Sequence, residues 1–226
     1  MKYANVSRGF FIRRTNRFVA EVEANGRTER VHVKNTGRCK ELLIPGAAVY
    51  LNEAANPNRT TKYDLVAVEK GDRLVNVDSG APNIVIREFL QSGKYLGDVT
   101  VVRSEAKYGA SRFDFYVEAG KLRIFIEVKG VTLEENGAVL FPDAPTQRGV
   151  KHLDELARCI NDGYEARVAF VVQMSGALYF TPNRRMHPAF GDALVRAGNA
   201  GVGIEAYDCV VTPDSLAIGR PVTVRL

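Results

Sequence analysis

The sequence predicts an α/β (α+β) chain in which a small OB-like β-barrel precedes a layered domain with a mixed sheet. Three observations support this prediction. Turn signals separate short strands up to residue 80, helices and strands alternate after it, and the charge balance changes at the same point. We therefore place an OB-like domain at residues 1–81 and an α/β domain at residues 82–226.

The N-terminal part shows short alternating runs bounded by turn residues such as Asn25-Gly26, Pro45-Gly46 and Gly71-Asp72. Five or six short strands over about 80 residues are typical of a small barrel of the OB type. We expect these strands at residues 9–14, 17–23, 28–34, 47–53, 63–69 and 74–77.

The excess positive charge lies entirely in this N-terminal part. Residues 1–82 contain 14 Lys and Arg against 9 Asp and Glu, whereas the remainder contains 17 of each. Arg13, Arg14 and Arg17 occur among the aromatic residues Phe10 and Phe18, and nucleic-acid surfaces combine cations for phosphates with rings for bases. We predict that these arginines bind nucleic acid; the alternative is a solvated basic face with the aromatic residues in the core.

The C-terminal part begins with a helix that Pro82-Asn83 starts and Gly93 ends. The order that follows, strand, hairpin, helix, strand, helix and strand, predicts a mixed α/β layer. Beyond the helix at 84–92, we expect a strand at 98–105, a hairpin within 112–129, a helix at 146–162, a strand at 167–173, a helix at 188–197 and a strand at 202–207.

Charged residues interrupt the two apolar runs of the predicted hairpin, residues 112–115 and 124–129. Asp114, Glu127 and Lys129 share one face of these strands, where a charge is costly unless another group compensates it. A divalent cation held by the two carboxylates would provide that compensation, with Lys129 beside it. The opposite face is expected to bury Phe113, Phe115, Val117, Ile124, Ile126 and Val128.

The register of this hairpin depends on its turn. We expect a two-residue turn at Ala119-Gly120, so that opposite charges meet across the strands. An ion pair between Arg112 and Glu127, with Lys129 extending into solvent, is the structural alternative to a cation site. The expected cross-strand pairs are Glu118 with Lys121, Asp114 with Phe125, and Arg112 with Glu127.

The helix at 146–162 carries charge on one side. Thr146 is a good N-cap, and the buried stripe is expected at Leu153, Leu156, Ala157 and Ile160. The other side contains Arg148, Lys151, His152 and Glu155. A helix with cations in its first turns is suited to binding phosphates, and a solvated charged face is the alternative.

Composition excludes several classes of protein. No apolar run approaches the ~18–20 residues of a membrane span, so we expect no membrane partner. Three widely spaced cysteines indicate a reducing cytoplasm and argue against a paired-cysteine zinc site. The absence of tryptophan disfavours a sugar-binding sensor.

Six segments in the same order resemble the sugar fermentation stimulation protein (SfsA) family. The resemblance implies an N-terminal OB-like domain, a PD-(D/E)XK nuclease-like domain, DNA binding and regulation of sugar metabolism. The matching segments are Asn35-Thr36-Gly37, Ser104 to Gly109, Ser111 to Phe115, Glu127 to Leu133, Phe141 to Ala144, and Thr146 to Leu156.

Within this resemblance, Asp114, Glu127 and Lys129 match the acid, acid and base of the nuclease motif. The expected cofactor is Mg²⁺, with Mn²⁺ as a substitute, because both prefer oxygen ligands. Glu105 ends the preceding predicted strand and is a candidate further ligand. The predicted nucleic-acid contacts in this domain are Arg112, Arg148, Lys151 and His152.

Two functions remain open from the sequence. The first is a cytoplasmic DNA-binding regulator of sugar metabolism that retains a metal-binding nuclease-like site. The second is an active Mg²⁺-dependent DNA nuclease. The C-terminal strands also offer an edge through which a homodimer could form.

Overall fold

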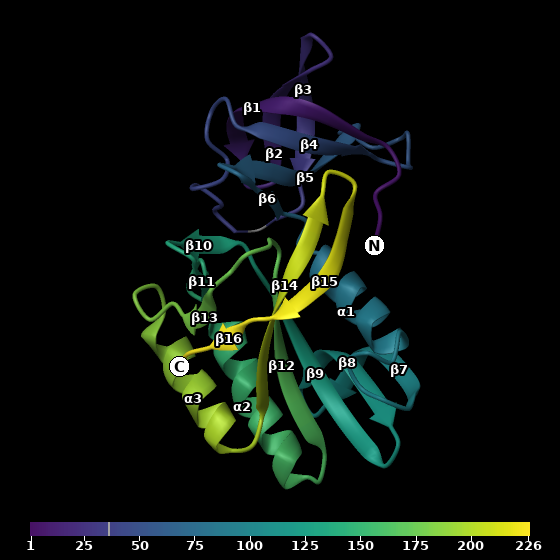
Figure 1. The fold of residues 1–226 in the computed structure, drawn as a ribbon, viewed down its shortest axis with the longest axis vertical. Helices are drawn as coiled ribbons and strands as arrows, with labels where there is room; N and C mark the ends of the chain where they lie inside the picture. The colour runs from purple at the N-terminus through teal and green to yellow at the C-terminus, as the bar shows by residue number, and fades with distance from the viewer. Residues whose placement is uncertain (36) are drawn as a thin grey trace.

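The computed structural model describes residues 1–35 and 37–226. Figure 1 shows a smaller part made of strands above a larger part that contains all the described helices. The strands of the smaller part are β1 (Val6–Asn16), β2 (Val19–Ala24), β3 (Arg27–Val33), β4 (Ala48–Glu53), β5 (Tyr63–Lys70) and β6 (Arg73–Asn76).

The smaller part is a closed barrel, as predicted. Its strands follow the order β3-β2-β1-β4-β5-β6, and parallel pairing of β3 with β5 closes the barrel. The Asn25-Gly26 turn joins β2 and β3 with φ angles of 52° and 73°, the left-handed conformation that a two-residue hairpin turn requires. The sequence therefore identifies both the barrel and one of its tightest turns.

The larger part contains a six-stranded mixed sheet, in the order β15-β14-β12-β9-β8-β7. β12 pairs in parallel with both β9 and β14, and the outer pairs are antiparallel. These strands are β7 (Val99–Tyr108), β8 (Ser111–Ala119), β9 (Leu122–Val131), β12 (Glu165–Val172), β14 (Gly203–Thr212) and β15 (Ser215–Pro221). The mixed sheet confirms the predicted fold class.

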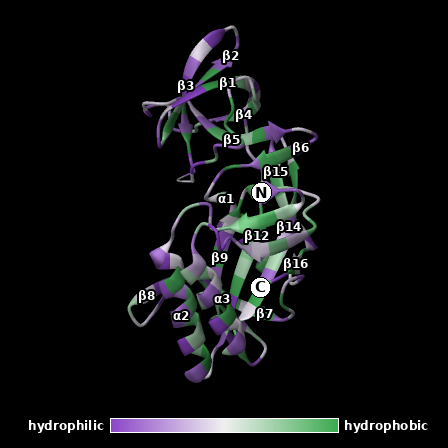
Figure 2. Ribbon diagram, turned by 90° about the vertical axis from the view of Figure 1, so that its left-hand side faces the viewer, coloured by the Kyte–Doolittle hydropathy of each residue, from purple (hydrophilic) through white to green (hydrophobic). Residues whose placement is uncertain are grey.

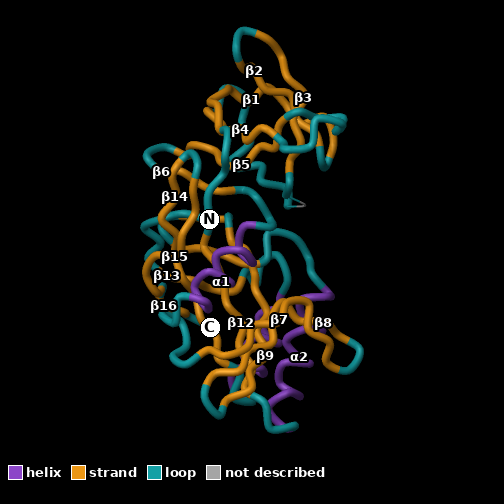
Figure 3. Tube along the Cα trace, turned by 90° about the vertical axis from the view of Figure 1, so that its right-hand side faces the viewer, coloured by secondary structure: helices purple, strands orange, loops and turns teal. Residues whose placement is uncertain are grey.

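Helices cover both faces of this sheet. Helix α1 (Ala81–Gln91) packs on one face, whereas α2 (Gln147–Asn161) and α3 (Pro188–Asn199) pack on the other. In Figure 3, α1 and α2 lie on opposite sides of the strands. Figure 2 shows hydrophobic residues along the central strands and mixed hydropathy on α2, which is the pattern of a helix with one buried face.

A small four-stranded sheet was not predicted. It consists of β10 (Leu133–Glu135), β11 (Ala138–Phe141), β13 (Tyr179–Pro182) and β16 (Thr223–Val224). Strands of two to four residues carry too little periodicity to detect. The β10–β11 hairpin nevertheless has a signal, because Asn136-Gly137 adopts φ angles of 50° and 85°.

The predicted hairpin register is wrong by two residues. The turn is Gly120-Lys121, and the observed pairs are Glu118 with Arg123 and Phe115 with Ile126. Gly120 has φ 58°, so the glycine takes the first position of the turn, where a positive φ is needed. A shift of two residues keeps the alternation of faces, and Glu127 remains on the face that packs against α2.

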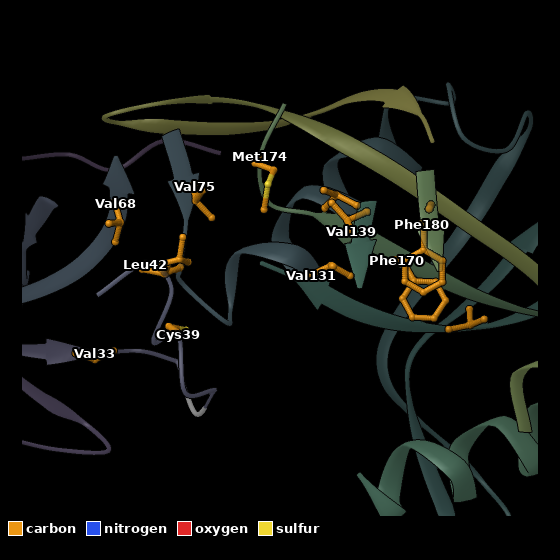
Figure 4. Close-up of a cluster of buried hydrophobic side chains, with 14 of the residues drawn as sticks. Val33, Cys39, Leu42, Val68, Val75, Val131, Val139, Phe170, Met174 and Phe180 are labelled. Carbon is orange, nitrogen blue, oxygen red and sulfur yellow. The ribbon is translucent and has the colours of Figure 1, made fainter. Parts of the chain in front are cut away.

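A continuous apolar core joins the two parts. The same cluster contains Val33, Leu42 and Val75 from the barrel and Val139 and Phe170 from the larger part. Figure 4 shows Met174 between the barrel residues and Val139. The β14–β15 hairpin also extends toward the barrel (Figure 1).

Buried polar contacts fix the orientation at this seam. Gln173 Nε2 donates to Asn76 Oδ1 at 2.8 Å and to the carbonyl oxygen of Asp78 at 3.0 Å. Lys34 Nζ, from the barrel, donates to the buried carboxylate of Asp78 at 2.7 Å. These directional bonds select one arrangement of the domains where apolar packing alone would permit several.

Candidate active site

The predicted acid pair lies in the interior of the larger domain, on neighbouring strands. Asp114 on β8 is partly buried, and Glu127 on β9 is only 3% exposed. Asp114 Oδ2 accepts a hydrogen bond from the backbone N–H of Val128 at 2.7 Å, and Oδ1 accepts one from Asn83 Nδ2 at 2.9 Å. The Val128 bond ties the side chain of Asp114 directly to the strand that contains Glu127.

Two cationic or polar groups contact Glu127. Lys129 Nζ donates to Glu127 Oε1, and His152 Nδ1 lies 2.5 Å from the same oxygen. Arg148 Nε donates to His152 Nε2 at 3.3 Å, which fits an imidazole with its proton on Nδ1. Glu127 Oε2 is buried and has no hydrogen-bond partner among the described residues.

The two carboxyl groups titrate in opposite directions. Burial raises the pKa of Asp114, and the neighbouring Glu127 charge raises it further. Burial also acts to raise the pKa of Glu127, but the hydrogen bond from His152 and the charge of Lys129 more than offset it, and the pKa is lowered. Glu127 is therefore stabilised as the anion, whereas Asp114 lacks a sufficient counter-charge.

Phe113 lies on a different side of β8 from the one predicted. Its ring contacts the rings of Phe125 and His152, at centroid distances of 5.5 Å and 5.9 Å, on the α2 face. Phe115 packs with the α1 face instead. The β8–β9 ladder ends at Phe115, so the strict alternation assumed from the sequence is lost at Phe113 and Asp114. Asp114 bonds to Asn83 of α1, whereas Glu127 contacts His152 of α2, so the prediction that both carboxylates share one face of the hairpin is wrong.

The alternative ion pair does not form. Arg112 Nε contacts Glu105 Oε2 at 2.7 Å, and both side chains are more than half exposed. Lys129 contacts Glu127 and does not extend away from it. Glu105 is bound to Arg112, and no group of three His, Cys, Asp or Glu side chains suited to a metal is found in residues 1–35 and 37–226.

Helix α2 buries residues that were predicted on its polar side. Thr146 caps the helix as predicted, accepting from the N–H of Gly149 at 3.0 Å. His152 and Glu155 are buried at 5% and 6% exposure, whereas Arg148 and Lys151 are exposed. The alternative of a solvated charged face is wrong for His152, because its imidazole is buried and contacts Glu127.

The three N-terminal arginines have different environments. Arg13 forms an exposed ion pair with Glu21 at 2.8 Å, and Arg17 lies over the ring of Phe18 at 5.7 Å. Arg14 donates to the carbonyl oxygens of Arg17, Asn35, Gly37 and Arg38. Arg14 therefore shapes the loop after β3, and its predicted contact with nucleic acid stays a prediction.

Segments that resembled the family meet at the domain seam. A cavity of about 160 Å³ is lined by Asn35, Gly37, Gly130 and Asp143, among others. A Cβ on Gly37 would collide with the carboxylate of Asp143, so this close approach requires glycine. Thr36, the middle residue of the Asn-Thr-Gly segment, lies outside the described residues.

Sequence reasoning missed several residues around these sites. Asn83 was assigned only to a helix start, although it holds Asp114. Arg38 and Lys40 flank buried Cys39 and line a second, basic cavity at the seam. The basic residues Arg38 and Lys40, which alternate with Gly37 and Cys39, were the sequence signal that could have indicated this cavity.

Comparison with known proteins identifies the family. A family model described as the sugar fermentation stimulation protein RE domain matches residues 80–215, and one described as the SfsA N-terminal OB domain matches residues 12–77. The chain belongs to the sugar fermentation stimulation protein family. Its larger domain is the restriction-endonuclease-like domain of that family.

Relatives match along the whole chain. A sugar fermentation stimulation protein homolog of Desulfitobacterium hafniense is 56% identical over 226 residues, covering 100% of this chain and 99% of the relative. A homolog of Clostridium beijerinckii is also 56% identical, covering 100% of both. The structure of Pyrococcus furiosus SfsA in complex with Ca²⁺ matches with a TM-score of 0.91 and 28% identity, covering 100% of this chain and 98% of that one.

The acid pair fits a hard divalent cation. Carboxylate oxygens are the ligands that Mg²⁺, Mn²⁺ and Ca²⁺ prefer, and Glu127 Oε2 is a buried oxygen without a described partner. The raised pKa of Asp114 indicates a second carboxylate that a nearby positive charge would stabilise as the anion.

None of the described helices is both long and apolar enough to cross a membrane.

Glu127→Gln should lower the free energy of unfolding of the metal-free protein at neutral pH by about 2 kcal/mol, a usual loss for hydrogen bonds to a charged group. Because folding lowers the pKa of Glu127, the ionised carboxylate stabilises the folded protein at pH values above 4.5, the ordinary pKa of this group. That stability is lost as the pH falls through the folded-state pKa. Urea denaturation of the wild type and Glu127→Gln from neutral to acidic pH measures the difference in their free energies of unfolding. A difference that is equally large in acid would contradict the prediction.

Proposed function

We propose that this protein binds DNA, holds a divalent cation at Asp114 and Glu127, and acts in the regulation of sugar metabolism. The observation that carries the proposal is the buried acid pair, with Glu127 Oε2 left without a hydrogen-bond partner among the described residues. The whole-length similarity to Pyrococcus furiosus SfsA, whose structure was solved with Ca²⁺, supports a cation at this domain. The role in sugar metabolism rests on membership of the family.

Asp114 and Glu127 would hold Mg²⁺ or Mn²⁺, together with the backbone carbonyl of Val128. A cation there would draw negative charge from a bound phosphate group. Asn83 and the N–H of Val128 fix the orientation of Asp114, and His152 fixes Glu127. The protein thus holds both carboxylates in place before a cation arrives.

Exposed cations beside the acid pair support DNA binding. Arg148 and Lys151 lie on the exposed side of α2, and Arg148 contacts the same His152 that contacts Glu127. A phosphate at the acid pair would therefore meet Arg148 within one helical turn of His152. Arg112 is less available to bind a phosphate, because its guanidinium forms an ion pair with Glu105.

Hydrolysis of DNA is the second candidate, and Lys129 favours it. A site that only bound DNA would need no buried lysine beside two carboxylates, yet the Lys129 side chain is 16% exposed and contacts Glu127. Lys129 would donate to a non-bridging oxygen of the phosphate as negative charge develops there. Water would add to phosphorus and break one P–O bond, giving a phosphate monoester and a free hydroxyl group.

Asp114→Ala and Glu127→Ala should abolish stabilisation by divalent cations. Binding only to the folded state raises the free energy of unfolding by about 2.7 kcal/mol when the cation is at 100 times its dissociation constant. Thermal unfolding with and without Mn²⁺, Mg²⁺ or Ca²⁺ measures this change, and Glu118→Gln on the same hairpin is the control. Loss of the effect in Glu105→Gln would support the predicted third ligand; stabilisation that survives both alanine variants would refute the site.

DNA affinity should fall steeply between ~50 and ~200 mM salt, because binding releases counterions from the phosphates. Charge reversal at Arg13, Arg17, Arg148 or Lys151 should weaken binding and reduce this salt dependence. Fluorescence anisotropy of labelled DNA measures both quantities, with Lys121→Glu, on the β8–β9 turn, as the control. Binding that does not respond to salt, or an equal loss in the control, would contradict the proposal.

If the site is hydrolytic, Asp114→Ala and Glu127→Ala should abolish Mg²⁺-dependent cleavage while DNA is still retained. Lys129→Met should slow cleavage by about 10²–10³-fold, the usual effect of losing one donor to a developing anion. Lys107→Met, on the neighbouring strand β7, is the matched control. If single-stranded, duplex and branched DNA all stay intact with Mg²⁺ and Mn²⁺, hydrolysis is excluded and the binding proposal stands.

A further inference from the structure

A basic cavity lies at the seam, apart from the acid pair. Its volume is about 540 Å³, within the ~300–1,000 Å³ typical of small-molecule sites. The barrel provides most of the lining and the larger domain adds Ala144. The cavity is therefore built mainly by the barrel, and the larger domain borders it through Ala144.

The charge of this cavity is strongly one-sided. Arg14, Arg17, Arg38 and Lys40 line it, and none of the lining residues within residues 1–35 and 37–226 is acidic. The side chains of Arg38 and Lys40 are exposed, and neither forms an ion pair with a described carboxylate. Cations gathered in one cavity whose described lining has no acidic residue favour binding of an anion.

Arg14 makes this cavity rigid. Its guanidinium donates to the carbonyl oxygens of Gly37 and Arg38 at 2.9 Å and 2.8 Å, and it also bonds to Asn35 and Arg17. Its Nε is buried and has no described hydrogen-bond partner. The loop that presents Arg38 is thus fixed in advance, which lowers the entropy lost when a ligand binds.

Apolar groups accompany these cations. Leu43 and Ala144 belong to the lining, and Leu43 is buried. Phe18 is 48% exposed, and its ring lies under the guanidinium of the lining residue Arg17. An exposed aromatic ring beside cations suits a nucleobase joined to a phosphate. In a duplex the base faces are covered by stacking, so a duplex does not present this combination.

A second, smaller cavity adjoins the basic cavity at the seam. Gly37 lines both the basic cavity and the smaller seam cavity, whose lining also includes Gly130. Gly130 follows Lys129 directly on β9, and a Cβ there would lie 2.9 Å from Pro82 Cγ. The two cavities thus share Gly37, and the smaller one reaches strand β9 at Gly130.

We propose that the basic cavity binds one nucleotide unit of single-stranded nucleic acid, with its phosphate at Arg38 and Lys40 and its base at Phe18. The inference deepens the DNA-binding part of the proposed function and rests on it. A free nucleotide offers the same phosphate and base, so the test includes it as a separate ligand.

Binding of a short single-stranded oligothymidylate should depend on Arg38 and Lys40. The double variant R38A/K40A should reduce the slope of log affinity against log salt by ~1.4, since each phosphate contact on a single strand contributes ~0.7. Phe18→Ala should weaken binding about tenfold through loss of one base stack. The matched control K94A/K121A removes the same charge from exposed sites outside the cavity and should change neither quantity. Fluorescence anisotropy measures these affinities, and circular dichroism verifies that each variant is folded.

The outcomes separate this inference from the proposed function. If the wild type binds oligothymidylate and R38A/K40A binds it with the same slope, the cavity assignment is wrong while DNA binding stands. If the wild type binds duplex but not single strands, the single-strand assignment is overturned. If it binds no nucleic acid, the proposed function and this inference both fail. Calorimetric titration of the wild type with thymidine monophosphate, in which the heat depends on Arg38 and Lys40, would then assign the cavity to a free nucleotide instead.

Discussion

The packing of the barrel against the nuclease-like domain is the constraint on which the seam between the two domains depends. Apolar side chains from the two domains form one core around Met174, and the bonds of Gln173 and Lys34 fix its orientation. This core brings Gly37 of the barrel against Asp143 of the larger domain. The smaller seam cavity lies at that contact and is lined by residues of both domains.

Charge inside the nuclease-like domain is compensated unevenly. Glu127 contacts His152 and Lys129. Asp114 accepts hydrogen bonds only from neutral donors, and Lys129 acts on it through its charge without a hydrogen bond. Burying a carboxylate without a counter-charge costs free energy that packing alone would not retain. The cation proposed for this site would supply the positive charge that this arrangement lacks.

Under the proposed function, the basic cavity and the acid pair divide the chemistry of nucleic-acid recognition between the two domains. The cations of the cavity that Arg14 shapes would bind one phosphate of the strand. The acid pair, with its cation and Lys129, would polarise another phosphate. In this arrangement the barrel positions the strand and the larger domain acts on it. The two steps have separate residues, so substitutions in one domain need not disable the other.

Local sequence signals determined the barrel, the order of strands and helices in the larger domain, and the identity of Asp114, Glu127 and Lys129, because turn chemistry and alternation act over a few residues. The family segments added the nuclease-like fold. Only tertiary structure decided that the hairpin turns at Gly120, that His152 faces Glu127, and that Arg38 and Lys40 share a cavity with Arg14. These depend on which surfaces meet after folding, and contacts between residues far apart in the chain leave no periodic signal in the sequence.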